Sequence, residues 1–424
     1  MFLISDLIKL PEETVVEFRG IVHAVRDLKK YTFLVLEQEG CSVQVVCEKS
    51  ENKVWNFSRF QHVEVTGSIK KSPKGEVEIH AIAAHLLGEC NTSNLLDEKA
   101  GLETQLDERH ISLRFKSSQS ILRLSSLFEY ALRQYWFENG YTEIHTPKIV
   151  EGATESGAEV FKLDYFGSSA SLAQSPQFYK QLAVIGGFNR VFEVGSVFRA
   201  EPSFTSKHAT DFTMIDVEIG GITSVSDVID EEESLLLYAF KYLLSSDMVA
   251  QDIKEKLLQI ISGPRFLRIS HKDVIDILAK EYGHTINDDQ DLDSAAEKMI
   301  CDFSRKNGLG DFVFVTHYPA KVRAFYTMIS DDGQTSESFD LLWSGVEITS
   351  GAQREHRLSF LLENLAQKSI DPTSISSYLK FFEASAPPHG GFGIGLARVI
   401  SILCKQESIR TSSFVFRGPN RLVP

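Results

Sequence analysis

Hydrophobic and polar residues alternate with a period of two through much of the first 90 residues, as they do in β-strands. The alternation is clear in residues 15–20 and 32–36, and turn-forming residues occur near 39–40 and 72–75. No clear helical periodicity interrupts it. Several short strands of this kind predict a small β-barrel over residues 1–90.

The alternation ends in a polar, charged stretch, residues 91–113, which predicts a hinge. Beyond it, apolar residues recur at the three-and-four spacing of a long amphipathic helix. They are Ile121, Leu124, Phe128, Ala131 and Tyr135. Strand-like stretches such as 190–199, 212–219 and 343–349 then alternate with helical ones, and this mixture predicts an α+β domain over residues 114–424.

The composition is that of a globular protein: 43% of the 424 residues are hydrophobic and 24% are charged. No apolar run approaches the roughly 20 residues that a membrane helix needs, so we expect a cytoplasmic protein without a membrane partner. The five cysteines lack the spacing of a metal or disulfide motif. The formal charge of −14 disfavours nucleic acid as a partner, although it does not exclude a local basic surface.

Residues 190–199 and 212–219 read as two strands joined by a polar loop. A period of two places Phe212 and Met214 on the same face of the second strand as Asp216 and Glu218. An aromatic ring and two carboxylates therefore share one face. Taken alone, this pattern slightly favours a solvated sheet face over a site, because charged residues are mostly exposed.

Three further segments carry candidate chemistry. The loop after Arg199 has mixed charge and suits a triphosphate, since guanidinium groups match phosphate geometry. Glu347, Ser350 and Arg354 fall within one short segment, where carboxylate and hydroxyl oxygens suit magnesium. Residues 387–398 form a glycine-rich run that opens an apolar helix, where an anion could approach the backbone. Each segment also has a purely structural reading, as a hairpin, an isolated pattern or a tight turn.

The order and content of these segments resemble class II aminoacyl-tRNA synthetases, and within them the aspartyl enzymes of the archaeal and eukaryotic type. Residues 141–147 resemble the first motif of that class, which ends in a proline at the dimer interface. Residues 198–213 resemble the second motif and residues 393–398 the third. Residues 171–181 are similar to the segment that reads aspartate. The similarity extends over nearly the whole chain.

This resemblance implies an N-terminal OB-fold that binds the anticodon, followed by a class II catalytic domain with a central antiparallel sheet flanked by helices. It implies an enzyme that activates L-aspartate with ATP to aspartyl-adenylate and transfers the aspartyl group to the 3′ end of tRNA-Asp. The expected cofactors are ATP and Mg²⁺. The expected partners are aspartate, the anticodon and acceptor end of tRNA-Asp, and a second copy of the chain in a homodimer, with neither DNA nor a membrane.

The resemblance also assigns roles to single residues. The aspartate-binding set is Glu155, Gln177, Lys180, Arg199, Asp216, Ser350 and Arg354. The ATP-binding set is Arg199, Ala200, Glu201, Lys207, His208, Ala209, Phe212, Glu347, Gly395, Leu396, Ala397 and Arg398. Arg199, Glu347 and Arg398 would act in catalysis, and Glu347 with Ser350 would hold magnesium. In the barrel, Phe33 would stack on an anticodon base and Gln44 would hydrogen-bond one.

Within the substrate set, Lys180 and Arg354 would together hold the side-chain carboxylate of aspartate. Asparagine would leave both cations unpaired, so Lys180 is the feature against an asparaginyl enzyme. Departures from the family pattern, such as Lys207 in place of arginine, motivate a third reading, a paralogue that makes aspartyl-adenylate for an acceptor other than tRNA. A non-catalytic tRNA-binding relative is the fourth. His23 stands where some relatives strictly specific for tRNA-Asp have tryptophan, which leaves charging of tRNA-Asn open.

Overall fold

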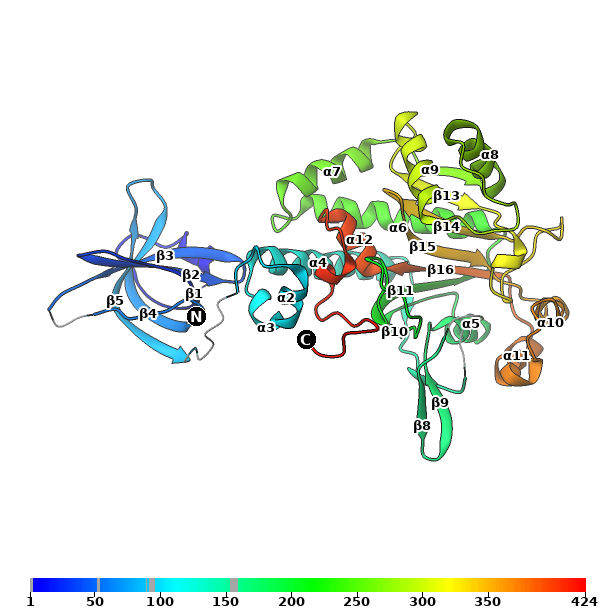
Figure 1. Ribbon diagram of the computed structural model, residues 1–424, viewed down its shortest axis with the longest axis horizontal. Helices are drawn as coiled ribbons and strands as arrows, with labels where there is room; N and C mark the ends of the chain where they lie inside the picture. The colour runs from blue at the N-terminus through cyan, green and yellow to red at the C-terminus, as the bar shows by residue number, and fades with distance from the viewer. Residues whose placement is uncertain (1–2, 52–53, 89, 91–95, 153–158) are drawn as a thin grey trace. The chain divides into compact units, whose positions relative to one another are not determined.

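The computed structural model describes residues 3–51, 54–88, 90, 96–152 and 159–424 of the chain. Two compact units follow each other, Met1–Ser120 and Ile121–Pro424 (Figure 1). Within the described residues, no helix combines the length and the apolar character needed to cross a membrane. The five cysteines are free thiols.

The first unit contains the predicted barrel, which is closed in the strand order β1-β2-β3-β5-β4. The strands are β1 (Val15–Asp27), β2 (Tyr31–Gln38), β3 (Cys41–Glu48), β4 (His62–Lys71) and β5 (Val77–Gly88). Period-two alternation turns residues such as Phe18, Leu34 and Val65 into the barrel core, where they are fully buried. Short helices are α1 (Ile4–Leu7), α2 (Leu102–Asp107) and α3 (Arg109–Ser112), and the last two lie in the stretch where the sequence pattern gave no periodicity.

The second unit is built on an eight-stranded sheet in the order β12-β13-β14-β15-β16-β11-β10-β6. Neighbouring strands are antiparallel except at the two edges, where β12 pairs with β13 and β10 with β6 in parallel. The strands are β6 (Thr142–Glu143), β10 (Arg190–Phe198), β11 (Asp211–Gly220), β12 (Leu267–Ser270), β13 (Phe312–Thr316), β14 (Ser338–Trp343), β15 (Val346–Gln353) and β16 (His389–Gly395). The strand predicted at 343–349 starts too early, because Ser344 and Gly345 have positive φ angles of 53° and 78° and form the turn between β14 and β15.

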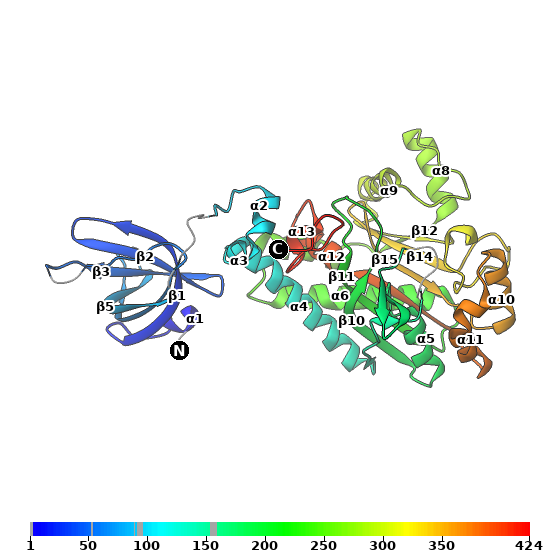
Figure 2. The same cartoon turned by 60° about the horizontal axis from the view of Figure 1, so that its bottom comes forward.

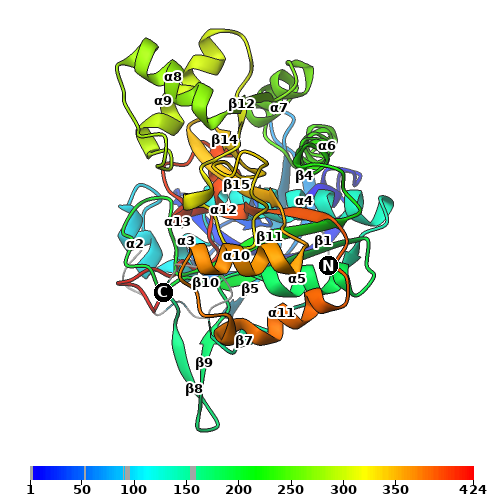
Figure 3. The same ribbon diagram turned by 90° about the vertical axis from the view of Figure 1, so that its right-hand side faces the viewer.

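Helices cover one face of this sheet. The helix predicted from Ile121 onward is α4 (Lys116–Glu138), which packs with α6 (Val225–Ser245) against apolar side chains of the sheet (Figure 2). Residues Ile215, Phe339 and Phe392 supply the sheet side of this core and are fully buried. The same strands present their other face to a cavity. The outer β12–β13 edge is covered by α8 (His271–Tyr282) and α9 (Ser294–Lys306) (Figure 3).

The remaining elements lie around the sheet. They are α5 (Gln177–Ile185), α7 (Gln251–Ser262), α10 (Leu358–Gln367), α11 (Ser376–Glu383), α12 (Leu396–Leu403) and α13 (Ile409–Ser412), with a small sheet of β7 (Ile149–Val150), β9 (Ser168–Leu172) and β8 (Lys162–Tyr165). Figure 3 shows α5 beside α11. The apolar side chains of these helices join those of Phe325 and Tyr326 in a separate cluster.

Candidate active site

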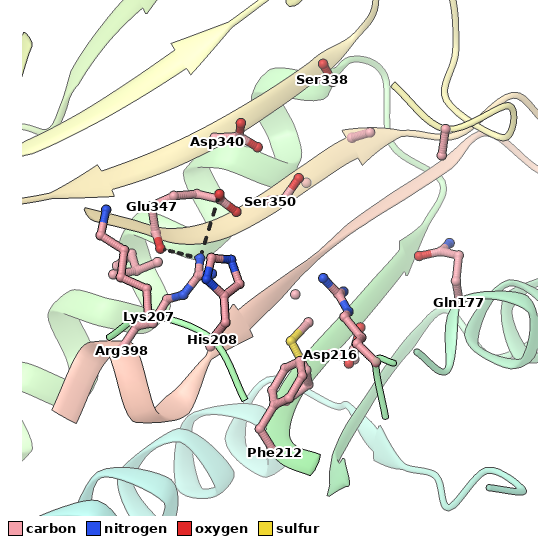
Figure 4. A pocket seen from close by; sticks show the side chains of 18 of the residues that line it. Gln177, Lys207, His208, Phe212, Asp216, Ser338, Asp340, Glu347, Ser350 and Arg398 are labelled. Atoms are coloured by element: carbon pink, nitrogen blue, oxygen red, sulfur yellow. Dashed lines mark hydrogen bonds and ion pairs between the residues drawn. The ribbon is translucent and has the colours of Figure 1, made fainter. Parts of the chain in front are cut away.

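A cavity of about 460 Å³ opens over the free face of the large sheet. Its walls come from α5, from strands β11, β14, β15 and β16, and from the loop between β10 and β11 (Figure 4). Strand register explains how residues far apart in the chain meet there. Asp216 pairs with Gly393, Gly393 with Ser350, and Ser350 with Asp340, so these residues form one row across four strands.

Gly391 and Gly393 leave this part of strand β16 without side chains on the cavity face. A Cβ atom at Gly391 would lie 2.3 Å from Oε2 of Glu218, and one at Gly393 would lie 2.6 Å from Cε of Met214. Any other residue at these positions would displace the side chains that β11 turns toward the same face. The glycine-rich run opens the helix α12 as the sequence predicts, but its glycines belong to strand β16 rather than to a turn.

Helix α5 turns polar residues toward the sheet. Its buried positions follow the i, i+3, i+4, i+7 spacing of a packed face, yet three of the four are polar: Gln177, Lys180 and Gln181. Buried polar groups need partners, so a face of this kind marks a site rather than simple packing.

The two cations that the resemblance assigns to the substrate carboxylate meet at Glu218. Nε and Nη2 of Arg354 lie 2.9 and 3.3 Å from its two carboxylate oxygens, and Nζ of Lys180 lies 3.4 Å from Oε2. Nζ of Lys180 also donates to Oδ1 of Asp216 at 3.1 Å. Burial alone would raise the pKa of Glu218, but Arg354 and Lys180 hold it below its usual value.

The carboxylates of Asp216 and Glu218 are therefore buried, with 4% and 0% exposure. The solvated-face reading of this strand is wrong. Glu218 also has a place in the site that the sequence did not assign, although the alternation had put it on the correct face.

The opposite end of the cavity holds a second group of carboxylates. Burial and the neighbouring carboxylate of Asp340 raise the pKa of Glu347 to about 7, even though 36% of its side-chain surface is open to the cavity. Nη1 of Arg398 donates to the main-chain oxygen of Glu347 at 2.8 Å and lies 3.7 Å from Oε2 (Figure 4). Among the described residues, no three His, Cys, Asp or Glu side chains are grouped as metal ligands.

Arg323 is a site residue that the sequence analysis did not single out. Its guanidinium donates to both oxygens of Asp340 at 3.0 and 2.5 Å and to Oγ of Ser350 at 3.3 Å. It also stacks on the ring of Tyr318, with its carbon 3.7 Å from the ring centroid. Burial opposes its charge, but Asp340 raises the pKa of Arg323, so the guanidinium remains cationic beside the row of strands.

The loop between β10 and β11 adds further cations. Nζ of Lys207 lies 3.1 Å from Oε2 of Glu297 in α9. Burial, with Arg398 nearby, lowers the pKa of His208. The guanidinium carbon of Arg199 lies 5.6 Å from the ring centroid of Phe212, in cation–π range.

The structure brings most of the expected residues to this one cavity. Those that line it are Gln177, Lys180, Arg199, Glu201, Lys207, His208, Ala209, Phe212, Asp216, Glu347, Ser350, Arg354, Gly395, Ala397 and Arg398. Ala200 and Leu396 lie next to lining residues but do not line the cavity themselves. Glu155 falls outside the described residues.

The two barrel residues lie on strands of the first unit. Phe33 on β2 is half-buried, whereas its neighbours Thr32 and Leu34 are fully buried, so its ring belongs to the outer face rather than to the core. Gln44 on β3 donates from Nε2 to Oε1 of Glu78 at 2.6 Å.

Comparisons with known proteins agree with this architecture. Residues 101–415 match the family model of the class II tRNA synthetases (D, K and N), and residues 16–87 match that of the OB-fold nucleic acid binding domain. The chain therefore belongs to the class II tRNA synthetases of the D, K and N group. The expected family and fold class are confirmed.

The individual relatives named below are aspartate and asparagine enzymes. The chain is 36% identical to an Aeropyrum pernix protein named aspartate–tRNA(Asp/Asn) ligase, with 99% of both chains covered, and 35% identical to the aspartate–tRNA(Asp) ligase of Pyrococcus abyssi, with 96% of both covered. The asparaginyl-tRNA synthetase of Pyrococcus horikoshii, complexed with asparaginyl-adenylate, matches with a TM-score of 0.88 at 28% identity over 97% of both chains. The aspartyl-tRNA synthetase of Entamoeba histolytica matches at 0.85 and 29% identity, over 100% of this chain and 92% of that one.

Proposed function

We propose that the chain is an aspartate–tRNA ligase, which activates L-aspartate with ATP and transfers the aspartyl group to the 3′ end of tRNA-Asp. The observation that carries the proposal is the buried cluster of Lys180, Arg354 and Glu218. Lys180 also pairs with Asp216, so two cations face two carboxylates in the free protein. Once Asp216 binds the substrate ammonium, as proposed below, Lys180, Arg354 and Glu218 leave one positive charge for the side chain of the amino acid. The side-chain carboxylate of aspartate would neutralise that charge, whereas the amide of asparagine would leave it buried and unpaired.

An asparaginyl enzyme is the nearest alternative, and the fold does not separate the two, since the Pyrococcus horikoshii asparaginyl enzyme matches with a TM-score of 0.88. The charge of the cluster favours the acid over the amide. The names of the Aeropyrum pernix and Pyrococcus abyssi relatives support the same choice.

The remaining groups around the cluster suit the backbone of the amino acid. The carboxylate of Asp216 would hold the substrate ammonium, together with Oε1 of Gln177 and with Glu155. Nε2 of Gln177 is buried and has no hydrogen-bond partner in the described part of the chain, so it is available to a substrate oxygen. The α-carboxylate would then be free to attack the α-phosphorus of ATP, with pyrophosphate as the leaving group.

The loop end of the cavity would take ATP. Arg199 would bridge the attacking carboxylate and the α-phosphate and stabilise the charge that develops on phosphorus. Lys207 and His208 would reach the outer phosphates, and adenine would lie between Phe212 and Arg398. No protein nucleophile is needed, so these residues accelerate the reaction mainly by positioning.

The carboxylates of Glu347 and Asp340, with the nearby hydroxyl of Ser350, form a site that suits a divalent cation. Burial and the carboxylate of Asp340 raise the pKa of Glu347, so a bound cation would stabilise its ionised form. Glu347 with Ser350 offers one carboxylate and one hydroxyl, a set that leaves room for water and phosphate oxygens. Magnesium, when bound, would screen the phosphates and help pyrophosphate to leave.

Transfer to tRNA would use both units. The terminal ribose hydroxyl of tRNA would attack the aspartyl-adenylate and release the adenosine phosphate. Phe33, on the outer face of the barrel, would stack on an anticodon base and Gln44 would bond to one. A cytoplasmic homodimer completes the proposal, with residues 141–147 at the subunit contact.

Charging of tRNA-Asn as well is a second candidate function, which His23 favours. Its Nδ1 lies 3.2 Å from Oε1 of Glu37 on the neighbouring strand, so a polar pair occupies the place of the tryptophan that some strictly specific relatives have. The Aeropyrum pernix relative is itself named for both tRNAs.

Two assays on the purified full chain test the proposal. ATP–pyrophosphate exchange is expected to be at least about a thousandfold more efficient with aspartate than with asparagine, and labelled aspartate is expected on tRNA-Asp transcripts. Charging of tRNA-Asn transcripts would add the second function. Exchange with asparagine alone would identify an asparaginyl enzyme. Exchange without any tRNA charging would identify a paralogue with another acceptor, and no exchange at all a non-catalytic relative.

A further inference from the structure

A buried chain of hydrogen-bonded side chains lies beside the Lys180–Glu218–Arg354 cluster, and the proposed reaction assigns it no role. The hydroxyl of Tyr378 lies 3.1 Å from Oε1 of Gln181, and Nε2 of Gln181 lies 2.9 Å from Nε2 of His389. Nδ1 of His389 lies 2.8 Å from the main-chain oxygen of Pro387. Gln181 and His389 are 0% exposed and Tyr378 is 1% exposed.

The partners fix the direction of each bond. A main-chain oxygen only accepts, so Nδ1 of His389 carries a proton. Oε1 of Gln181 accepts from Tyr378, which leaves the amide nitrogen to donate to Nε2 of His389. The imidazole is therefore neutral. Burial, which lowers the pKa of His389, agrees with this assignment.

His389 also joins the two elements that carry the cations. Its side chain is bonded to Gln181, the residue that follows Lys180 in α5, and its main-chain oxygen accepts the backbone N–H of Arg354 at 2.8 Å. One residue thus links the position of Lys180 to that of Arg354 through bonds that do not involve Glu218.

Such a link has a physical use. A lysine ammonium is a point charge with little directional preference, so its contacts with Glu218, with Asp216 and with the main-chain oxygens of Val217 and Phe392 set the separation of the two cations only loosely. Directional hydrogen bonds between neutral groups fix it more tightly, and they add no charge to a cluster whose net charge decides between acid and amide.

We propose that Gln181 and His389 are positioning residues for substrate selection, which hold Lys180 and Arg354 at the separation where both can share Glu218 and still receive the carboxylate of an acidic amino acid. Tyr378 supports them by orienting the amide of Gln181. This inference rests on the proposed aspartate specificity of the cavity.

Gln181→Leu tests it, because leucine has a similar size and makes neither hydrogen bond. The ratio of kcat/KM for aspartate to that for asparagine in ATP–pyrophosphate exchange is expected to fall about tenfold, mostly through KM for aspartate. KM for ATP is expected to change by less than about twofold. Tyr378→Phe removes only the outer hydroxyl and is expected to lower the ratio about threefold.

A matched control loses a buried hydrogen bond elsewhere. Oγ of Ser304, in α9, donates to the main-chain oxygen of Gly310 at 2.8 Å and lies outside the cavity wall, so Ser304→Ala is expected to leave the ratio unchanged. A purely structural role for Gln181 would lower kcat for both amino acids alike and preserve the ratio, and that result would overturn the inference.

Tyr378→Phe provides the test if Gln181→Leu does not fold. An unchanged ratio of kcat/KM for aspartate to that for asparagine in soluble Tyr378→Phe would also overturn the inference. Absence of aspartate-dependent exchange in the unmodified chain would instead overturn the proposed function, so the two failures are distinguishable.

Discussion

The two ends of the cavity treat charge in opposite ways. At the end proposed for the amino acid, here called the amino-acid end, Lys180 and Arg354 are already paired with the buried carboxylates of Asp216 and Glu218. At the end proposed for ATP, here called the nucleotide end, Glu347 lies near a second carboxylate, that of Asp340. Burial and this neighbour raise the pKa of Glu347 to about 7. The first end is organised before any substrate arrives, because its charges hold one another in place. The second holds Glu347 and Asp340 close together beside Arg323 and Arg398, and the raised pKa of Glu347 suits a divalent cation that binds with ATP.

The largest effect is expected from removing the ion pair between Arg354 and Glu218 at the amino-acid end. Arg354→Leu would leave Glu218 buried with a single cation, and loss of one partner of a buried pair typically costs about 3–5 kcal/mol of unfolding free energy. Aspartate-dependent exchange is expected to fall at least about a hundredfold. Chemical unfolding and exchange assays measure the two effects.

The exposed pair of Arg305 with Asp302 provides the control for that variant. Arg305→Leu is expected to cost less than about 1 kcal/mol, since solvent screens such pairs. Equal losses in the two variants would show that the Arg354 pair has no special weight.

The nucleotide end can be disabled separately. Glu347→Gln removes the carboxylate proposed for magnesium, so kcat for exchange is expected to fall about a hundredfold. KM for aspartate should stay within about twofold, because Lys180, Glu218 and Arg354 are untouched. Steady-state kinetics at saturating ATP measure both constants, and a parallel rise in KM for aspartate would contradict the separation of the two ends.

The pH dependence of magnesium activation tests the raised pKa of Glu347 at the nucleotide end. Glu347 is largely protonated below its pKa of about 7, and a neutral carboxyl holds a cation poorly. The magnesium concentration for half-maximal exchange is therefore expected to rise as pH falls, by up to about tenfold per unit below pH 7. Magnesium titrations at pH 6, 7 and 8 measure this, and a half-maximal concentration that is independent of pH would contradict it.

A carboxyl group behind the sheet is expected to affect stability rather than activity. Glu232 in α6 is 0% exposed, and burial raises its pKa to about 8, with Thr349 of β15 as the polar side chain that faces it. Between about pH 5 and 8 the unfolded chain releases this proton while the folded chain keeps it, so stability falls as pH rises.

Glu232→Gln removes that titration. Relative to the variant, the unmodified chain is expected to lose about 2–4 kcal/mol of unfolding free energy between pH 5 and pH 8. Urea unfolding of both proteins across this range measures the difference, and parallel pH profiles would exclude a neutral buried Glu232.

Much of the fold followed from periodicity alone. The alternation at 190–199 and 212–219 predicted β10 and β11 to within about one residue, because side chains of a strand point to opposite faces whatever surrounds it. The same rule grouped Phe212 with Asp216 and Glu218. It could not say whether that face was exposed or buried, since this depends on α5, which packs against it, and on β16, which pairs beside β11 from a distant part of the chain.

The missed residues depend on contacts of the same kind. Glu218 acquires its place only because Lys180 and Arg354 converge on it, and Arg323 because β14 brings Asp340 beside it. One local signal was available: the buried face of α5 has helical spacing but carries Gln177, Lys180 and Gln181 instead of apolar residues. A polar stripe at core spacing would have pointed to Gln181 as well.

In the proposed function, Lys180 and Arg354 together select an acid over its amide. Its most direct test is the ratio of kcat/KM for aspartate to that for asparagine in ATP–pyrophosphate exchange, measured for the unmodified chain and for Lys180→Met. We expect a ratio of about a thousand or more in the unmodified chain and a fall of at least about a hundredfold in the variant. A ratio that Lys180→Met leaves unchanged would contradict it.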